Sequence, residues 1–245
     1  MFNIDRRMLY VILGIMALWG LASYLQNPSQ LLSLVLTLPG VIIAITFHEY
    51  AHALAADKCG DDTPRNQGRL TLNPLAHLDP FGFIMLVFAH VGWGKPVQIN
   101  PRNFNRKRTM SAQEALVSLA GPLMNFILAI IFTIIYFAII TFAPQFLKTT
   151  TGFVIELIIS LTITVNIGLG VFNLVPIPPL DGSKILMHFL PYNAKNWFIS
   201  NQNIFYIIFA VLWITGAISL IISPIINVIS SGIYYAVAAI FGLFI

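Results

Sequence analysis

The stretch Phe47-His48-Glu49-Tyr50-Ala51-His52 lies inside a long apolar run and decides how the rest of the chain is interpreted. If this run is a helix, residues four apart share one face, so His48 and His52 can present their imidazoles to a single metal ion. Glu49 follows His48 by about 100° around the helix, which lets its carboxylate reach a water molecule at that metal. This His-Glu-x-x-His spacing is typical of zinc-dependent hydrolases.

The composition places the motif in a membrane protein. The chain has 245 residues, of which 58% are hydrophobic and only 9% are charged. An acidic side chain at the centre of a membrane helix costs about 2.5 to 3.5 kcal/mol on insertion scales. Three ionisable side chains there therefore favour a metal site over two histidines that are simply hydrogen-bonded within a helix bundle. The single cysteine, Cys59, excludes an internal disulfide and a thiolate zinc cluster.

The hydrophobic runs predict an all-α polytopic membrane protein with about six transmembrane helices. The expected spans are residues 8–26, 31–56, 115–142, 153–174, 204–222 and 225–245. We expect an interruption at Gly121-Pro122 and a separation of the last two spans at Ser223-Pro224. Residues 180–190 are expected to form a short helix, and residues 193–203 a polar link.

A segment of another kind is expected around residues 81–100. The apolar run 81–91 is too short to cross a bilayer alone, which favours a re-entrant or interfacial segment. Residues 92–100 alternate like an irregular strand or the edge of a hairpin. Together they predict a re-entrant or hairpin segment beside the transmembrane helices.

The positions of lysine and arginine predict the orientation of the chain. Arg6 and Arg7 place the N-terminus in the cytoplasm, so the span with the metal motif runs from outside to inside. Residues 57–110 and 176–203 then lie on the cytoplasmic side, which holds twelve of the thirteen cations, while Lys148 lies outside. This distribution explains the formal net charge of +4 without nucleic acid as a partner. It also places the motif and the turn at residues 176–181 at similar depth.

A hydrolytic zinc site keeps three protein ligands and one open position, so the two histidines need a third ligand. Asp181 follows the proline-rich turn Pro176-Ile177-Pro178-Pro179 in an otherwise apolar neighbourhood, and Gly182 permits close approach of the chain. The alternative role of Asp181 is N-cap of the short helix after it, and the two roles are compatible because they use different atoms. His77 and Asp79 are rival ligands, although their loop position favours ordinary turn chemistry.

Three amides lie in or at the ends of apolar spans, where uncompensated burial is costly. Hydrogen bonding between helices is the ordinary role of such amides, and we favour it for Asn166. Asn173, beside the proline-rich turn, is a candidate to hold the substrate backbone or an oxyanion. Asn125 is the third amide. His90 and His188 lack a partner at ligand spacing and are expected to be structural or interfacial, and Glu156 is expected near the outer interface, far from the metal.

In their order along the chain, these motifs resemble the site-2 proteases, which are intramembrane zinc metalloproteases. The resemblance rests on His48-Glu49-x-x-His52, Gly121-Pro122-Leu123-Met124-Asn125 and Asn173-x-x-Pro176-x-Pro178-x-x-Asp181-Gly182. Gly68-Arg69-Leu70-Thr71-Leu72-Asn73-Pro74 and Gly92-Trp93-Gly94-Lys95-Pro96-Val97 are similar to the compact prokaryotic branch of that family, without a PDZ or CBS domain.

The resemblance implies a role for each matched residue. It implies His48, His52 and Asp181 as ligands of Zn²⁺ and Glu49 as the catalytic acid and base. It implies further that Asn125 and Asn173 line the site. It covers residues 31–190, the expected metalloprotease core, and leaves residues 1–30 and 191–245 as accessory N-terminal and C-terminal transmembrane helices. The expected location is a prokaryotic cell membrane.

The expected reaction is hydrolysis of peptide bonds in or near transmembrane segments of membrane protein or peptide substrates, within the lipid bilayer. A substrate helix must unwind locally because its carbonyls are tied up in internal hydrogen bonds. The edge at residues 93–100 is a candidate to capture the extended strand by β-addition, with a plain surface hairpin as the alternative. Substrate contacts are therefore expected at Trp93, Lys95, Pro96 and Val97.

A metal-ion or proton transporter that uses the same His and acid cluster is the alternative function. Transporters often show paired repeats, which are not visible here, and transport does not explain a glutamate directly after the first ligand. The complete motif set also argues against a catalytically idle scaffold. Regulated intramembrane proteolysis and signal-peptide clearance are both compatible with the prediction, and no oligomeric state is indicated.

Overall fold

Helices make up the regular structure of the described part of this computed structural model, which comprises residue 22 and residues 26–89, 92–105 and 107–242. The expected all-α fold is confirmed. Within these residues, four helices are long and apolar enough to cross a membrane: α2 (Pro28–Lys58), α5 (Met110–Phe142), α7 (Thr150–Asn173) and α11 (Ala217–Phe241). A shorter apolar helix, α10 (Gln202–Ile214), precedes α11. The span expected at residues 8–26 lies almost wholly outside the described residues.

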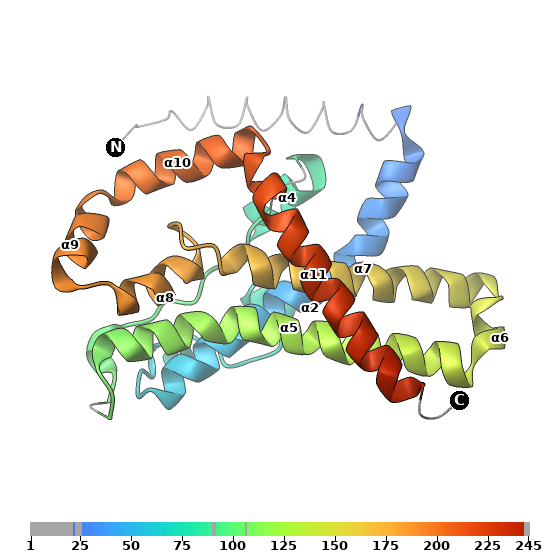
Figure 1. Cartoon of the computed structure of the whole chain (residues 1–245), viewed down its shortest axis with the longest axis horizontal. Helices are drawn as coiled ribbons and strands as arrows, with labels where there is room; N and C mark the ends of the chain where they lie inside the picture. Colours follow the sequence, from blue (N-terminus) through green and yellow to red (C-terminus); the bar gives the residue numbers. More distant parts are fainter. Residues whose placement is uncertain (1–21, 23–25, 90–91, 106, 243–245) are drawn as a thin grey trace.

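Helices α2, α5 and α7 pack against one another and form the centre of the molecule (Figure 1). The contact between α2 and α7 is close because Gly40 has no side chain: a Cβ there would lie 2.8 Å from the Thr162 Cα. An apolar cluster joins α5, α7 and α11 through buried residues that include Ile163, Ile167 and Ile222. Because α2 and α5 contact each other and both contact α7, they lie side by side.

Two expected helix breaks were wrong. Pro122 lies inside the continuous helix α5, and Pro224 lies inside α11. A proline removes one helical hydrogen bond, but α5 and α11 both continue through it and pack against α7. The break between the last two helices falls at Gly216 instead, whose φ of +70° is a left-handed conformation that glycine adopts readily.

The segment between α2 and α5 is a compact set of short elements. It contains α3 (Thr63–Asn66), η1 (Pro74–Ala76), α4 (Pro80–Ala89) and η2 (Pro101–Asn103). The expected strand at residues 92–100 is reduced, among the described residues, to an isolated antiparallel bridge between Leu78 and Gly94. Buried Arg69 donates hydrogen bonds to the carbonyls of Lys95 and Pro96 and to that of Ala76, which holds this extended segment (the edge, residues 92–100) against the loop at residues 69–76.

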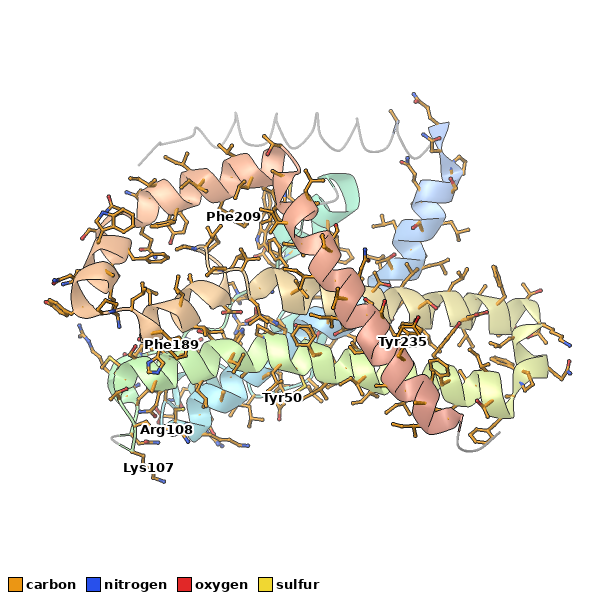
Figure 2. All side chains as sticks on the ribbon, viewed as in Figure 1. Tyr50, Lys107, Arg108, Phe189, Phe209 and Tyr235 are labelled. Atoms are coloured by element: carbon orange, nitrogen blue, oxygen red, sulfur yellow. The ribbon has the colours of Figure 1, made fainter. Side chains whose placement is uncertain are left out.

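Helix α7 is shorter than its neighbour α5, and α8 (Asp181–Phe189) packs along the part of α5 that α7 does not reach. After the short helix α6 (Pro144–Leu147), α7 runs back along α5 and ends at Asn173. The chain then turns, and α8 continues along α5 in the same direction (Figure 1). The polar link expected at residues 193–203 is largely the short helix α9 (Tyr192–Ser200). Phe189 lies at the same end of the molecule as Lys107 and Arg108 (Figure 2).

Asp61 ties the end of α2 to the edge. Its buried carboxylate accepts hydrogen bonds from the backbone N–H groups of Thr63 and Asn100, at 3.1 and 2.7 Å, and from the side chain of Asn103 at 3.0 Å. Burial alone would raise the pKa of this carboxyl, but a hydrogen bond from the Thr63 hydroxyl, together with the three above, holds the pKa below its ordinary value. A carboxyl with a lowered folded-state pKa stabilises the protein above its unfolded pKa, and this stabilisation is lost as the pH falls through the folded value.

We therefore predict that Asp61→Asn lowers the thermal stability of the purified protein in detergent at neutral pH. An amide there turns its NH₂ group toward other donors, and each buried group left unpaired costs about 1 to 3 kcal/mol. Asp62→Asn is the matched control, because Asp62 is exposed and its side chain makes no cap hydrogen bond to α3. The difference in melting temperature between wild type and Asp61→Asn should shrink toward acidic pH, and equal melting of all three proteins at neutral pH would contradict the assignment.

Candidate metal centre

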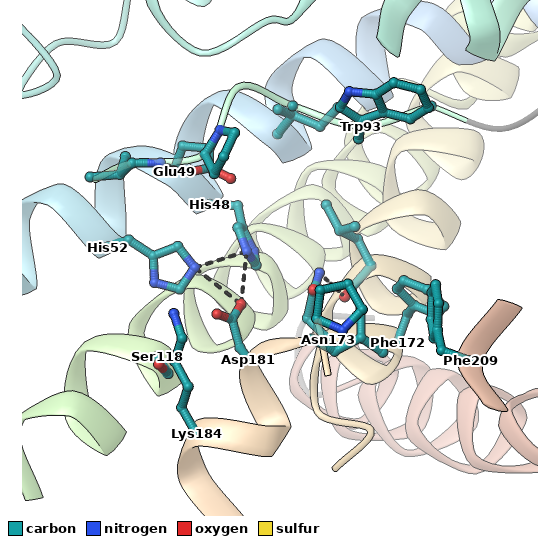
Figure 3. Close-up of a pocket in the computed structure, with 18 of the residues that line it drawn as sticks. His48, Glu49, His52, Trp93, Ser118, Phe172, Asn173, Asp181, Lys184 and Phe209 are labelled. Carbon is teal, nitrogen blue, oxygen red and sulfur yellow. Dashed lines mark hydrogen bonds and ion pairs between the residues drawn. The ribbon is translucent and has the colours of Figure 1, made fainter. Parts of the chain in front are cut away.

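Three potential ligand atoms from two separate parts of the chain meet beside α2 (Figure 3). His52 Nε2 lies 3.0 Å from His48 Nε2 and 3.1 Å from Asp181 Oδ2. His48 Nε2 lies 3.3 Å from the same carboxylate oxygen. Both histidines are buried, and Asp181 is partly buried. In the described part of the chain, His48, His52 and Asp181 are the three side chains whose ligand atoms lie close enough together to hold a metal ion.

The spacing of these atoms fits a tetrahedral zinc ion. Zinc bonds to nitrogen and carboxylate oxygen at about 2.0 to 2.2 Å, so two ligand atoms of a tetrahedron lie roughly 3.3 Å apart. The remaining ring nitrogens have their own partners: His48 Nδ1 lies 2.7 Å from Asn125 Oδ1, and His52 Nδ1 lies 2.7 Å from the Val117 carbonyl oxygen. Because both partners are acceptors, Nδ1 carries the proton on each ring and the Nε2 lone pair is free for a metal.

Asp181 reaches the histidines because α7 ends early. The turn between α7 and α8 folds tightly, and a Cβ on Gly182 would lie 2.6 Å from the Val175 carbonyl oxygen, closer than real contacts allow. Asp181 is the first residue of α8, while the N-cap position belongs to Leu180 and has no side-chain hydrogen bond. The expected alternative role of Asp181 as N-cap is therefore wrong, and its carboxylate faces the imidazoles.

Gly121 allows α5 to lie directly against the metal ligands. A Cβ at this position would overlap His52 Nε2 and lie 2.7 Å from His48 Nε2. The sequence reading treated Gly121-Pro122 as an interruption, whereas the structure shows that the missing side chain makes room for both imidazoles. Nothing in the helical periodicity of α5 indicated this contact, because it depends on the partner helix.

Glu49 lines the same cavity as the three ligands, a volume of about 690 Å³. Its Oε2 accepts a hydrogen bond of 2.9 Å from the backbone N–H of Val97, on the edge. This contact fixes one oxygen of the carboxylate, and Glu49 lies near the two histidines on the wall of the cavity (Figure 3).

Most of the residues expected to contact substrate lie around this cavity: Trp93, Pro96, Val97 and Asn173. Lys95 contributes its backbone, which donates to the His77 carbonyl oxygen. Asn125 is fully buried and contacts His48, so it supports the ligand from behind.

An aromatic wall that the sequence analysis missed closes the far side of the cavity. Phe172 lies in the last turn of α7, and Phe209 and Trp213 come from α10, with ring centroids 5.2 to 6.1 Å apart. Lys184, one turn after Asp181 on α8, points into the cavity (Figure 3). These residues carry no motif, and only the fold brings α10 to the site.

The rival ligands have other roles. His77 Nε2 contacts the Thr71 carbonyl oxygen at 2.8 Å, and Asp79 accepts a hydrogen bond from the Gly82 N–H at the start of α4. Glu156 lies 3.4 Å from the Tyr136 hydroxyl, and His188 packs edge-on against Phe189. His90 lies outside the described residues.

Four candidate membrane spans, a His-Glu-x-x-His helix and a distant aspartate together are typical of a class of membrane metallohydrolases, and comparison with known proteins agrees. The model of peptidase family M50 matches residues 36–162 and 148–216. A Bacillus subtilis (strain 168) protein named "Putative zinc metalloprotease YwhC" is 38% identical over 220 residues, covering 89% of this chain and 97% of that protein.

Two further relatives carry the name Rip2 and the same zinc metalloprotease description. The Mycolicibacterium smegmatis protein is 29% identical over 205 residues, 82% of this chain and 75% of the relative. A Mycobacterium tuberculosis (strain H37Rv) protein is 30% identical over 186 residues, 71% of this chain and 67% of the relative. No solved structure matches the chain.

The chain therefore belongs to peptidase family M50, the site-2 protease family, and is an intramembrane zinc metalloprotease. The resemblance drawn from the motifs is confirmed, as are the zinc cofactor and the enzymatic class. The transporter alternative finds no support in these matches.

The first prediction for this site concerns the carboxylate. Asp181→Asn should lower zinc content after purification and dialysis to well below one ion per chain, because an amide oxygen is a far weaker zinc ligand than a carboxylate. Elemental analysis of the purified protein measures this. Asn173→Ala, a change beside the same turn, is the control and should keep its zinc. Full zinc occupancy in Asp181→Asn would remove Asp181 from the ligand set.

The second prediction concerns the space at Gly121. Gly121→Ala should reduce zinc occupancy and proteolysis together, because the added methyl group would overlap both imidazoles. Gly232→Ala on α11 is a matched control, since a Cβ there meets no atom within 4 Å. Normal zinc content in Gly121→Ala would show that α5 does not lie against the ligands.

Proposed function

We propose that His48, His52 and Asp181 hold the catalytic zinc ion and that Glu49 is the general base and acid for peptide-bond hydrolysis. The observation that carries this proposal is the convergence of the two Nε2 atoms and Asp181 Oδ2 within 3.3 Å, with Glu49 in the same cavity. Zinc, when bound, polarises the scissile carbonyl and lowers the pKa of water at the site.

Residues of this chain then transfer the proton and bind the reacting groups. The Glu49 carboxylate accepts a proton from the attacking water through the oxygen that Val97 leaves free, and returns it to the leaving amine. Asn173 lines the cavity at the end of α7, where its amide is a candidate to hold the substrate carbonyl as negative charge develops. The aromatic wall of Phe172, Phe209 and Trp213 limits access of bulk water to the reacting groups.

We infer that the substrate is a transmembrane segment of a protein or peptide that binds in extended form. The edge supports this inference, because Trp93, Pro96 and Val97 line the cavity next to Glu49. Leu78 and Gly94 form a bridge on one side of the edge, and the other side is a candidate to pair with substrate by β-addition. The apolar walls of the cavity suit side chains from a membrane helix.

The arrangement of the helices supports a proposal for how the chain lies in the membrane. His48 lies ten residues before the last residue of α2, or about 15 Å along a helix, which is about half the thickness of the hydrocarbon core. We propose that this end of α2, the start of α5, α8 and α9 face the cytoplasm of a prokaryotic cell, with the N-terminus on the same side. The cations Lys107 and Arg108 at that end support this orientation.

The domain proposal concerns the two ends of the chain and the count of spans. Residues 31–190 form the proposed protease core, with residues 1–30 and 191–245 as accessory segments. Within the latter, α10 supplies Phe209 and Trp213 to the cavity, so we assign it to the substrate pocket. Helix α4, ten residues long, suits a re-entrant or interfacial position. Six spans remain our proposal for the whole chain, with residues 8–26 and α10 counted in addition to the four long apolar helices.

Glu49→Gln tests this function directly. The amide keeps the size of the side chain but does not take up a proton at neutral pH, so the variant should bind zinc normally and lose at least about a hundredfold in cleavage rate. The cleavage rate is measured with purified protein and a transmembrane test substrate in detergent, and zinc binding by elemental analysis. Glu114→Gln on α5 is the matched control and should cleave as wild type does. Retained cleavage by Glu49→Gln would exclude Glu49 as the base.

A further inference from the structure

Two fully buried amides, Asn125 of α5 and Asn166 of α7, lie behind the metal centre. They belong to different helices, and neither lines the substrate cavity. The sequence analysis expected Asn166 to join helices by hydrogen bonds and expected Asn125 to line the active site. Their actual contacts connect them to one of the metal ligands.

The hydrogen bonds of the pair run in a fixed direction. Asn166 Nδ2 donates to the Thr162 carbonyl oxygen at 2.9 Å, which turns Asn166 Oδ1 toward Asn125. Asn125 Nδ2 donates to that oxygen and to the Ala44 carbonyl oxygen, each at 3.1 Å. Asn125 Oδ1 is therefore the atom that faces His48 Nδ1, at 2.7 Å. Reversing either amide would set donors against donors or acceptors against acceptors.

This direction determines the protonation pattern of His48. Only an N–H at Nδ1 satisfies Asn125 Oδ1, and that tautomer leaves the Nε2 lone pair directed at Asp181 and His52. The other histidine, His52, has the backbone carbonyl of Val117 for the same purpose, which no side-chain substitution removes. His48 is thus the ligand whose orientation depends on side chains alone.

We propose that Asn125 and Asn166 act as a relay of positioning residues that fixes the tautomer and ring orientation of His48 and thereby raises the zinc affinity of the site. The inference rests on the proposed role of His48 as a ligand. It assigns Asn166, which lies two hydrogen bonds from the metal ligand, a functional role that helix packing alone does not give it. Asn166 acts on His48 only through Asn125.

The relay makes a different prediction from ordinary hydrogen bonding between helices. If the amides only join α5 to α7, replacing them lowers the stability of the metal-free protein and leaves the intrinsic zinc affinity of the folded protein unchanged. If they form a relay, zinc affinity falls, and the effect of Asn166 disappears once Asn125 is gone. Such dependence is what a double-mutant cycle measures.

The experiment determines zinc affinity by chelator competition with the purified full-length protein in detergent. Asn125→Leu should weaken zinc binding by about 10- to 100-fold, the range usual for partners behind a metal-bound histidine. Asn166→Leu should weaken it by about 3- to 10-fold, and should add less than about 2-fold in the Asn125→Leu background.

Thr133→Val is the matched control for buried polarity on α5. Thr133 is fully buried like Asn125, and its hydroxyl bonds to the Ala129 carbonyl of its own helix, so its loss should leave zinc affinity unchanged. Thermal unfolding of each variant in the presence of chelator measures the structural cost separately. Asn166→Ser, whose hydroxyl is shorter than the amide, replaces the leucine variant if that protein does not fold, and the same loss is expected.

Unchanged zinc affinity in Asn125→Leu and Asn166→Leu would overturn the relay, and so would losses that simply add in the double variant. The failure of the proposed function looks different. If wild-type protein binds no zinc, or binds it without any dependence on His48 as tested by His48→Ala, the ligand assignment itself is wrong. If wild type binds zinc through His48 and the amide variants match it, only the relay is wrong.

Discussion

The structure depends on direct contact between helix α5 and the two imidazoles of α2. Gly121 has no side chain to keep them apart, and a Cβ there would overlap His52. The same helix then supplies a backbone acceptor for His52 and, through Asn125, a side-chain acceptor for His48. One helix–helix interface therefore orients both imidazole rings and gives each a hydrogen-bond partner, as ionisable groups buried in an apolar helix require.

The third ligand depends on a difference in helix length. Helix α7 ends at Asn173, partway along α5, and the chain turns before α8 takes over the remaining distance. Non-helical backbone at that depth is tolerated only inside protein or beside a wet cavity, and this turn lies against the cavity that holds Glu49. The irregular turn and the catalytic site therefore occur together, because each requires the polar surroundings that the other supplies.

The sequence was sufficient for those parts of the site that depend on spacing within one helix or on a rare residue in an apolar run. His48, His52 and Glu49 follow from a helical period, and Asp181 stands out because an acid after a proline-rich turn has few ordinary reasons to lie at that depth. Gly121 and the aromatic wall were misread or missed, and Asn125 supports His48 from behind the cavity instead of lining it, since these roles arise from partner helices. The hydrogen bond between helices that was expected of Asn166 is confirmed. Proline was also given too much weight: Pro122 and Pro224 lie within helices that continue through them.

The central claim, that two imidazoles of α2 and the carboxylate of Asp181 share one zinc ion, is tested most directly by X-ray absorption spectroscopy of the zinc-loaded protein. The account predicts two imidazole nitrogens at about 2.0 to 2.1 Å and oxygen ligands at about 2.0 to 2.2 Å, with a changed oxygen shell in Asp181→Ala. A zinc spectrum with a third imidazole, or one that is identical in wild type and Asp181→Ala, would contradict it.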